Sequence, residues 1–218
     1  MGRRRHVGED PLRRPCGSRC RGRHRLDGVG RLHRRQGSPA RRRSTQKGAE
    51  GRNEPADHAL GRSRGGLSTK VHLAADGHAR PLALVVTAGQ AGDAPAFETV
   101  MARIRVPRGG PGQPRTRPTI ILADRAYSSR AIRTHLRRRQ IRTVIPQPSD
   151  QIGHRLRRGR RGGRPPGFDA DAYKQRNTVE RCINRLKQWR GLATRTDKLA
   201  IAYQAALHLA AILIWARR

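Results

Sequence analysis

One segment near the carboxyl end of this chain carries residue types that handle phosphates and metal ions. In DAYKQRNTVERCINRLKQ, residues 171–188, a helix would place four side chains within roughly 60° of one another: Tyr173, Arg176, Glu180 and Lys187. A neighbouring apolar stripe would consist of Val179, Cys182, Ile183 and Leu186. Such a helix buries one face and presents a carboxylate among cations on the next.

A second carboxylate, Asp124, lies in ADRAY, residues 123–127. Residues 119–123 have the composition of a buried strand, and Asp124 comes where that strand ends. Asp124 and Glu180 are 56 positions apart (180 − 124), so only tertiary folding can bring them together. Carboxylate oxygens are the ligands that Mg²⁺ prefers, and the ion keeps several waters, so few protein ligands suffice.

The other residues of the helix have roles that follow from their chemistry. The planar guanidinium of Arg176 can grip a phosphate through two hydrogen bonds, and Lys187 can act on a phosphate as a point charge. Tyr173 can stack or form a hydrogen bond close by. The alternative is an ordinary helix surface, where Arg176 and Glu180 form an i,i+4 ion pair worth about a few tenths of a kcal/mol and Tyr173 simply packs.

Hydrophobic patterns predict the elements that would position these residues. Two strands, residues 67–73 and 82–86, flank a tight turn at Asp76, which is followed by glycine. A helix follows over residues 93–104, with Asp93 as its N-cap. The turn therefore explains Asp76 and the cap explains Asp93, and neither is a candidate catalytic residue.

A strand–helix–strand unit follows the first hairpin. The strand at residues 119–123 leads to a helix that Ser128 or Ser129 can cap, and residues 141–146 form the next strand. A final apolar helix is expected over residues 199–215. Two antiparallel strands followed by such a crossover indicate an α/β fold, with a mixed sheet flanked by helices.

Basic residues dominate the composition. The chain of 218 residues has 49 Lys and Arg against 15 Asp and Glu, a formal net charge of +34, which favours nucleic acid over a membrane surface as partner. Segments rich in Arg, Gly and Pro at residues 107–118 and 147–168 are expected to be flexible basic loops. Residues 1–66 show almost no periodicity, which predicts disorder. The apolar segment 199–215 is interrupted by polar residues and is too short for a membrane span.

The cysteines indicate a reducing compartment. Cys16, Cys20 and Cys182 make no disulfide framework. Cys16 and Cys20 with His24 and His33 match no standard zinc-finger spacing. The chain is expected in the cytoplasm, associated with the nucleoid.

Two motifs in order resemble one enzyme family. The spacing of Tyr173, Arg176, Glu180 and Lys187 resembles the Tyr-Arg-Glu-Lys signature of bacterial insertion-sequence transposases of the DDE superfamily, as in the IS-four and IS-five groups. ADRAY is similar to the second motif of that family, and PADHALGRSRGGLSTKVHLAADG, residues 55–77, is also similar to these enzymes. The resemblance covers roughly residues 40–218.

The resemblance implies a fold, a chemistry and partners. It implies a ribonuclease-H-like sheet that binds two Mg²⁺ (or Mn²⁺) ions, which would assist phosphodiester cleavage and strand transfer at insertion-sequence ends. By this resemblance Asp124 and Glu180 are catalytic metal ligands, and Tyr173, Arg176 and Lys187 contact DNA. Terminal inverted repeats and target DNA are the implied partners, with a possible homodimer on DNA and no membrane.

The family has a third carboxylate, on its opening strand, which this sequence does not supply. Residues 23–46 show no strand pattern, and Asp27 is the one carboxylate there. A shift of one nucleotide can convert Arg31, Leu32 and His33 into Asp-Ser-Thr and residues 23–30 into an apolar-alternating strand. We therefore interpret residues 1–43 as a disordered arm translated out of frame, and residues 44–218 as a truncated catalytic domain.

Two other hypotheses remain at this point. The first is a non-enzymatic basic protein that binds nucleic acid, which would share the charge but would not need both motifs. The second is that the reading frame yields no stable protein. Metal dependence separates the first from the transposase, because a pure binding protein should hold DNA equally with EDTA or Mg²⁺.

Overall fold

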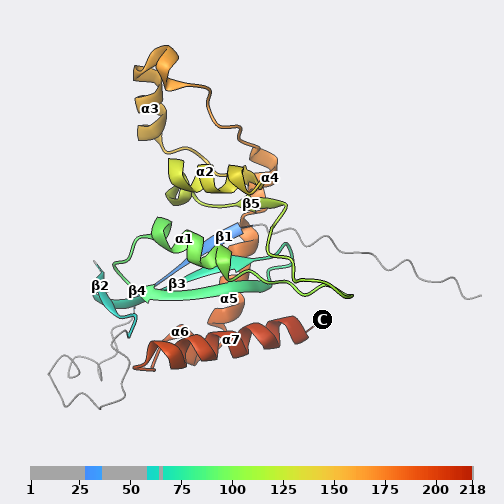
Figure 1. Cartoon of the computed structure of the whole chain (residues 1–218). Coiled ribbons are helices and arrows are strands. Elements are labelled where there is room, and N and C mark those ends of the chain that lie inside the picture. Colours follow the sequence, from blue (N-terminus) through green and yellow to red (C-terminus); the bar gives the residue numbers. More distant parts are fainter. Residues whose placement is uncertain (1–27, 36–57, 64–65, 218) are drawn as a thin grey trace, which may run out of the picture.

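The structure is a computed structural model, and it describes residues 28–35, 58–63 and 66–217. The chain folds into small sheets with helices on both sides (Figure 1). In Figure 1, α1 lies on one side of the larger sheet and α7 on the other, and a separate helical projection stands at the top. The predicted α/β class is confirmed.

The larger sheet is built on the predicted hairpin. Strand β3 (Gly66–Ala75) pairs antiparallel with β4 (Pro81–Ala88), and Val71 lies opposite Val86. Helices cover both faces of β3, so residues along its length are buried on either side. The pairing partners on the other edge of β3 are β1 (Gly28–Arg35) and β2 (Gly61–Ser63), both antiparallel.

Strand β1 corrects one expectation. Residues 23–46 were expected to have no strand, yet β1 pairs with β3 along its whole length, with Arg31 opposite His72. The open edge of β3 offers unpaired N–H and C=O groups. These groups can pair with a segment whose sequence does not alternate between apolar and polar residues. Strand β2 also lies within residues 1–66, which were predicted to be disordered, and the rest of that segment, residues 1–27, 36–57 and 64–65, lies outside the described residues.

The second sheet contains the predicted strand–helix–strand unit. Strand β5 (Ile120–Leu122) is parallel to β6 (Arg142–Val144), and α2 (Arg130–Arg138) connects them. The Ser129 hydroxyl accepts a hydrogen bond from the Ile132 amide at 3.2 Å, so the predicted cap is confirmed. Strand β5 contacts β1, which places the two sheets side by side.

Two hydrophobic clusters hold the layers together. The first joins the sheet to α1 (Asp93–Ala102) and α2, and its fully buried members include Phe97, Val100 and Leu136. The second joins the opposite face of β3 to α5 (Asn177–Lys187), α6 (Arg190–Ala193) and α7 (Ala200–Ala216). No helix among the described residues is long and apolar enough to cross a membrane.

A buried ion pair fastens the start of α1 to the sheet. Asp93 was expected to cap this helix, but Gly92 occupies the cap position and Asp93 is the first helical residue. The carboxylate of Asp93 lies 3.3 Å from the Lys70 ammonium, and both side chains are less than a tenth exposed. Lys70 also donates a hydrogen bond to the carbonyl of Ala91. The buried Lys70 on β3 therefore decides the role of Asp93 at the start of α1.

A buried arginine joins the carboxyl-terminal segment to the sheet edge. Arg195 is 2% exposed and donates hydrogen bonds to the carbonyls of His58 and Ala59 at 2.7 and 3.2 Å. It also donates to the Thr69 hydroxyl. The guanidinium lies over the Tyr203 ring, 4.9 Å from its centre. These contacts tie the loop before α7 to residues that precede β2.

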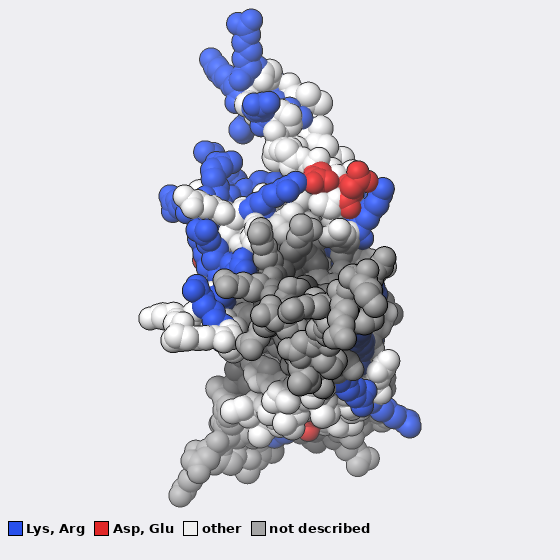
Figure 2. All heavy atoms as spheres, turned by 90° about the vertical axis from the view of Figure 1, so that its right-hand side faces the viewer, with Lys and Arg blue, Asp and Glu red and all other residues white. Residues whose placement is uncertain are grey.

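The basic segment 147–168 is a second correction. It was expected to be a flexible loop, but it contains α3 (Ser149–Arg157) and η3 (Gly159–Gly162). We call the whole segment, residues 147–168, the arm. The arm projects away from the sheets (Figure 1), and Figure 2 shows Lys and Arg side chains gathered at that end of the molecule. Its composition suggested a loop because only Ile152 and Leu156 mark a helical period, and both are exposed.

Cys182, on the buried face of α5, should react with thiol reagents only after unfolding. Burial raises the pKa of its thiol to about 12, so the protonated form persists in the folded chain at pH 8. With Cys16 and Cys20 replaced by serine, a colorimetric thiol reagent should label denatured protein completely and native protein hardly at all. The raised pKa stabilises the fold below the pKa of the unfolded thiol, about 8.5, and this contribution should decline as the pH rises toward 12. Rapid native labelling at pH 8 would contradict this prediction.

Candidate metal and DNA site

Asp124 lies directly beyond the end of β5. The Ala123 amide donates to the Val144 carbonyl at 3.3 Å, which extends the β5–β6 pairing up to that point. The half-buried Asp124 then caps η2 (Arg125–Tyr127) by accepting a hydrogen bond from the Arg125 amide at 2.6 Å. Buried Tyr127 anchors the turn, because its ring packs against Phe97 with centroids 5.7 Å apart. The carboxylate is therefore held on a rigid turn at the sheet end.

The helix predicted over residues 171–188 is two helices. Helix α4 (Ala170–Lys174) ends before α5 begins, and Tyr173 lies on α4 while Glu180 lies on α5. Between them the backbone makes tight i→i−3 hydrogen bonds, from the Arg176 amide to Tyr173 and from Thr178 to Gln175. Periodicity could not find this break, because the tightened residues keep helix-like backbone angles.

The break still leaves three of the four predicted residues together. The Arg176 guanidinium lies 2.7 Å from a Glu180 carboxylate oxygen and 5.7 Å from the centre of the Tyr173 ring. Tyr173 also packs on Phe168, with centroids 5.3 Å apart. The Glu180 side chain is 54% exposed and open to solvent. Lys187 is the last residue of α5 and is exposed, roughly 10 Å along the helix axis from Glu180.

The Tyr173 phenol lies within electrostatic range of both Asp124 and Glu180. Burial is the main cause that raises the pKa of the Tyr173 phenol, and the Arg176 charge opposes it. Asp124 raises this pKa further, Arg125 lowers it, and Glu180 raises it. The pKa of Tyr173 is thus raised by Asp124, which follows β5, and by Glu180, which lies on α5. That Asp124 and Glu180 act together as metal ligands stays a prediction.

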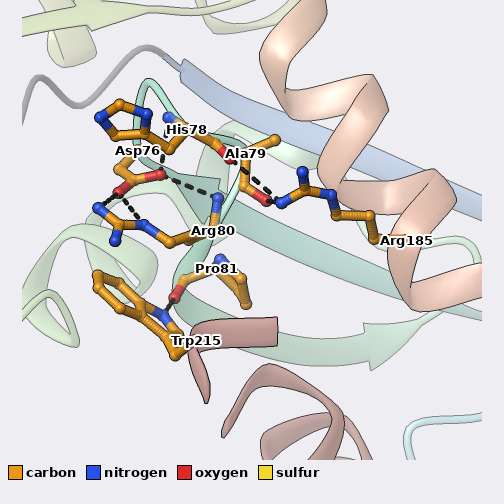
Figure 3. Close-up of polar contacts among 7 residues, drawn as sticks. All are labelled: Asp76, His78, Ala79, Arg80, Pro81, Arg185 and Trp215. Atoms are coloured by element: carbon orange, nitrogen blue, oxygen red, sulfur yellow. Dashed lines mark hydrogen bonds and ion pairs between the residues drawn. The ribbon is translucent and has the colours of Figure 1, made fainter. Parts of the chain in front are cut away.

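Helix α5 is fixed to the β3–β4 turn, which sets the position of Glu180. The Arg185 guanidinium donates to the carbonyls of His78 and Ala79 at 3.2 and 3.3 Å (Figure 3). The turn itself depends on Asp76, which is buried and accepts hydrogen bonds from the amides of His78 and Arg80. The predicted role of Asp76 in the turn is therefore confirmed.

The other end of the same network lies on α7. Arg80 pairs with Asp76 at 2.5 Å and lies 4.0 Å from the centre of the Trp215 ring, while the Trp215 indole donates to the Pro81 carbonyl (Figure 3). The turn thus bridges two helices of the second hydrophobic cluster. This bracing limits the freedom of α5 relative to the sheet.

Sequence reasoning missed a set of polar residues behind Asp124. Arg133 on α2 donates to the Ser128 hydroxyl at 2.9 Å and to the Ile145 carbonyl at 2.8 Å, and burial lowers its pKa. Ser128 in turn donates to the Gln151 side chain at 2.9 Å. An arginine in an arginine-rich helix carries no signal of such a role. Arg125, by contrast, could have been recognised from the sequence as a residue near the site, because it directly follows Asp124 in ADRAY.

Two carboxylates make up the acidic part of the site. The residues that the structure describes include no group of three or more His, Cys, Asp or Glu that could hold a metal ion. The half-buried Asp124 and the exposed Glu180 supply hard oxygen atoms, which suit Mg²⁺ or Mn²⁺ better than softer metals. Glu180 must exchange its ion pair with Arg176 for a metal before it can act as a ligand.

A mixed α/β domain with two carboxylates among arginines at a sheet end has the parts of a metal-dependent site for phosphoryl transfer. The model of the family described as "Transposase DDE domain" matches residues 30–215. The chain belongs to this family. The match begins within β1.

Two relatives agree with this assignment. The chain is 27% identical over 155 residues to a putative transposase for insertion sequence element IS6501 from Brucella ovis, an alignment that covers 69% of this chain and 100% of that protein. It is 30% identical over 164 residues to a putative transposase for insertion sequence element IS402 from Burkholderia cepacia, covering 75% of this chain and 69% of that protein. No solved structure gives a significant match.

Proposed function

We propose that the chain is an insertion-sequence transposase domain, related to the IS-four and IS-five groups, that retains its second and third acidic ligands and has lost the first. The observation that carries the proposal is the family match over residues 30–215, within which Asp124 follows β5 and Glu180 lies on α5, paired with Arg176. The partners are DNA ends and target DNA, in the cytoplasm on the nucleoid, with a homodimer as the acting form.

The arrangement of strands supports a ribonuclease-H-like domain. Strand β3 lies between β4 and β1, and β1 contacts β5, whose partner is β6. The antiparallel strands β4, β3 and β1 thus lie next to the parallel pair β5–β6, which forms a separate sheet. Asp124 follows β5, next to the strand on which the family carries its first carboxylate.

The lost ligand belongs on β1. A shift of one nucleotide can convert residues 31–33, which lie within this strand, into Asp-Ser-Thr. Strand β1 pairs on one side with β3 and contacts β5 on the other. The proposed position is therefore on the strand next to the one that ends at Asp124.

The residues of the site then divide the work. Bound divalent ions would stabilise charge on the attacking and leaving oxygens of a phosphodiester. Asp124 and Glu180 would hold them, Arg176 and Lys187 would bind DNA phosphates, and Tyr173 would pack close to the DNA strand. Arg176 would have two roles. Without metal and DNA it pairs with Glu180, and when a metal binds Glu180 it would be released to bind a phosphate.

Titration with Mn²⁺ tests the site directly. The full chain should bind Mn²⁺ weakly, and Glu180→Gln should weaken that binding further, by roughly tenfold, an expected loss of about 1.4 kcal/mol. Binding can be followed by the electron paramagnetic resonance signal of free Mn²⁺. Glu98→Gln is the matched control, because Glu98 is also exposed and its carboxylate also contacts a neighbouring side chain, 3.5 Å from the His135 ring nitrogen.

Two outcomes would count against the proposal. Identical titrations for wild type and Glu180→Gln would leave Glu180 as part of an ordinary surface ion pair. DNA binding and strand cleavage that are the same in EDTA and in Mg²⁺ would favour a non-enzymatic binding protein instead.

A further inference from the structure

The arm carries a cluster of arginines around one hollow. Four of them line a pocket of about 710 Å³, and all four are exposed: Arg157, Arg158, Arg160 and Arg161. Asp150 is the one acidic residue of the arm, and it lies in the first turn of α3, away from these arginines in sequence. The pocket is therefore strongly cationic and fits a ligand with several negative charges.

The arginines are held in this arrangement by glycines. Gly159 has a positive φ of 51°, a backbone conformation that other residues seldom adopt. At Gly162 a side chain would come within 2.1 Å of the Arg155 carbonyl oxygen, so only glycine lets η3 fold back on α3. The turn therefore has a defined backbone conformation, which fixes the positions from which the arginine side chains extend.

Both ends of the arm are joined to the candidate site. At its start, Gln151 of α3 accepts a hydrogen bond from Ser128, four positions after Asp124, at 2.9 Å. At its return, Phe168 packs on Tyr173, the residue that senses both carboxylates. A polyanion bound to the arm would thus be held at a fixed position relative to the metal site.

We propose that the arm is a second DNA site, distinct from the metal site, that binds the sugar-phosphate backbone of duplex DNA without regard to sequence and holds it relative to Asp124 and Glu180. Guanidinium groups bind phosphate oxygens through charge-assisted pairs of hydrogen bonds, which fix a backbone in place but do not read bases. The proposal rests on the proposed function only in identifying the polyanion as DNA.

Salt dependence of DNA binding by the full chain tests the arm. A fluorescent duplex of about 30 base pairs, unrelated to any insertion sequence, is titrated in EDTA from about 50 to 200 mM salt. Each phosphate contact contributes about 0.9 to the slope of log K against log salt, so replacing Arg157, Arg158, Arg160 and Arg161 with glutamine should reduce that slope by roughly 3 to 4. The affinity at about 50 mM salt should fall by more than roughly 100-fold.

Two further variants test whether the effect depends on the position of the arginines and on their charge. The control replaces four exposed arginines on other elements with glutamine, Arg62, Arg105, Arg190 and Arg217, and should reduce the slope by about 1 or less. Replacing the four arm arginines with lysine keeps the charge and should restore most of the slope. Circular dichroism and the Mn²⁺ titration should be unchanged in all three variants.

The outcomes are distinguishable from those of the proposed function. Equal slopes for the arm and control variants, or tighter arm-dependent binding to duplex RNA than to DNA, would overturn the assignment of the arm. Glu180→Gln would still weaken Mn²⁺ binding in that case, and the proposed function would stand. If Glu180→Gln bound Mn²⁺ as tightly as the wild type while the arm variant still lowered the salt slope, the metal site would be overturned and the assignment of the arm would stand.

Discussion

Replacing residues 1–43 with their one-nucleotide-shifted translation should raise strand cleavage at the matching insertion-sequence ends by roughly 10²–10³-fold. The shifted frame can encode an aspartate at position 31, on β1, which contacts β5, the strand that precedes Asp124. A third carboxylate would complete the set of ligands for divalent ions, which would stabilise the charge that develops on the attacking and leaving oxygens. The measurement is cleavage of a labelled duplex carrying the element's ends, with Mg²⁺ and with EDTA.

The control for this prediction is the shifted chain with asparagine at position 31. It has the shifted sequence without the charge of the aspartate, so it separates the effect of the ligand from other effects of the changed sequence. We expect it to cleave no faster than the present chain. If the present chain cleaves as fast as the shifted one, Asp27 or another residue already supplies the ligand, and the frame interpretation is wrong.

Breaking the buried ion pair between Lys70 and Asp93 should have the largest effect on stability. Asp93→Ala removes the carboxylate and leaves a buried ammonium without its counter-charge, a change that typically costs about 3–5 kcal/mol. The His72 ring, 3.9 Å from the same carboxylate, would lose its neighbour as well. Urea unfolding followed by circular dichroism should show a lower midpoint with an unchanged slope.

The chain contains a matched surface pair for comparison. Lys174 and Asp171 lie 2.8 Å apart, but their side chains are 78% and 90% exposed, against 6% and 8% for Lys70 and Asp93. Asp171→Ala should therefore change stability by about 0–1 kcal/mol. Lys70→Met combined with Asp93→Leu should recover much of the loss, because neither charge is then left buried alone. Equal costs for Asp93→Ala and Asp171→Ala would contradict the role given to burial.

The parts of the fold that depend on local chemistry could be predicted from sequence. The hairpin at Asp76 follows from its side chain bonding its own turn, and the start of α2 follows from the Ser129 cap. The family was predicted from the order of two motifs and is confirmed, whereas the pairing of Asp124 with Glu180 stays a prediction. These signals lie within a few residues of one another or repeat with a clear period.

The rest depended on contacts that sequence does not display. Asp93 has the local features of a cap, but Lys70, which lies 23 positions earlier (93 − 70), decides its role. The break between α4 and α5 involves a small change in hydrogen bonding, from i→i−4 to i→i−3. Strand β1 forms against an edge of β3, so its own arginine-rich pattern gives no sign of it.

The contacts of Arg195 bear on the order in which the chain can fold during synthesis. Its hydrogen-bond partners His58 and Thr69 precede it by 137 and 126 positions. The ribosome adds about 5–20 residues per second, so the sheet edge must wait several seconds for the residue that completes it. A stop codon before position 195 would release a chain whose buried carbonyls at that edge lack their donor. We therefore expect early stop codons to abolish the fold, whereas a frame error confined to the first 43 residues would remove a ligand and leave most of the domain able to fold.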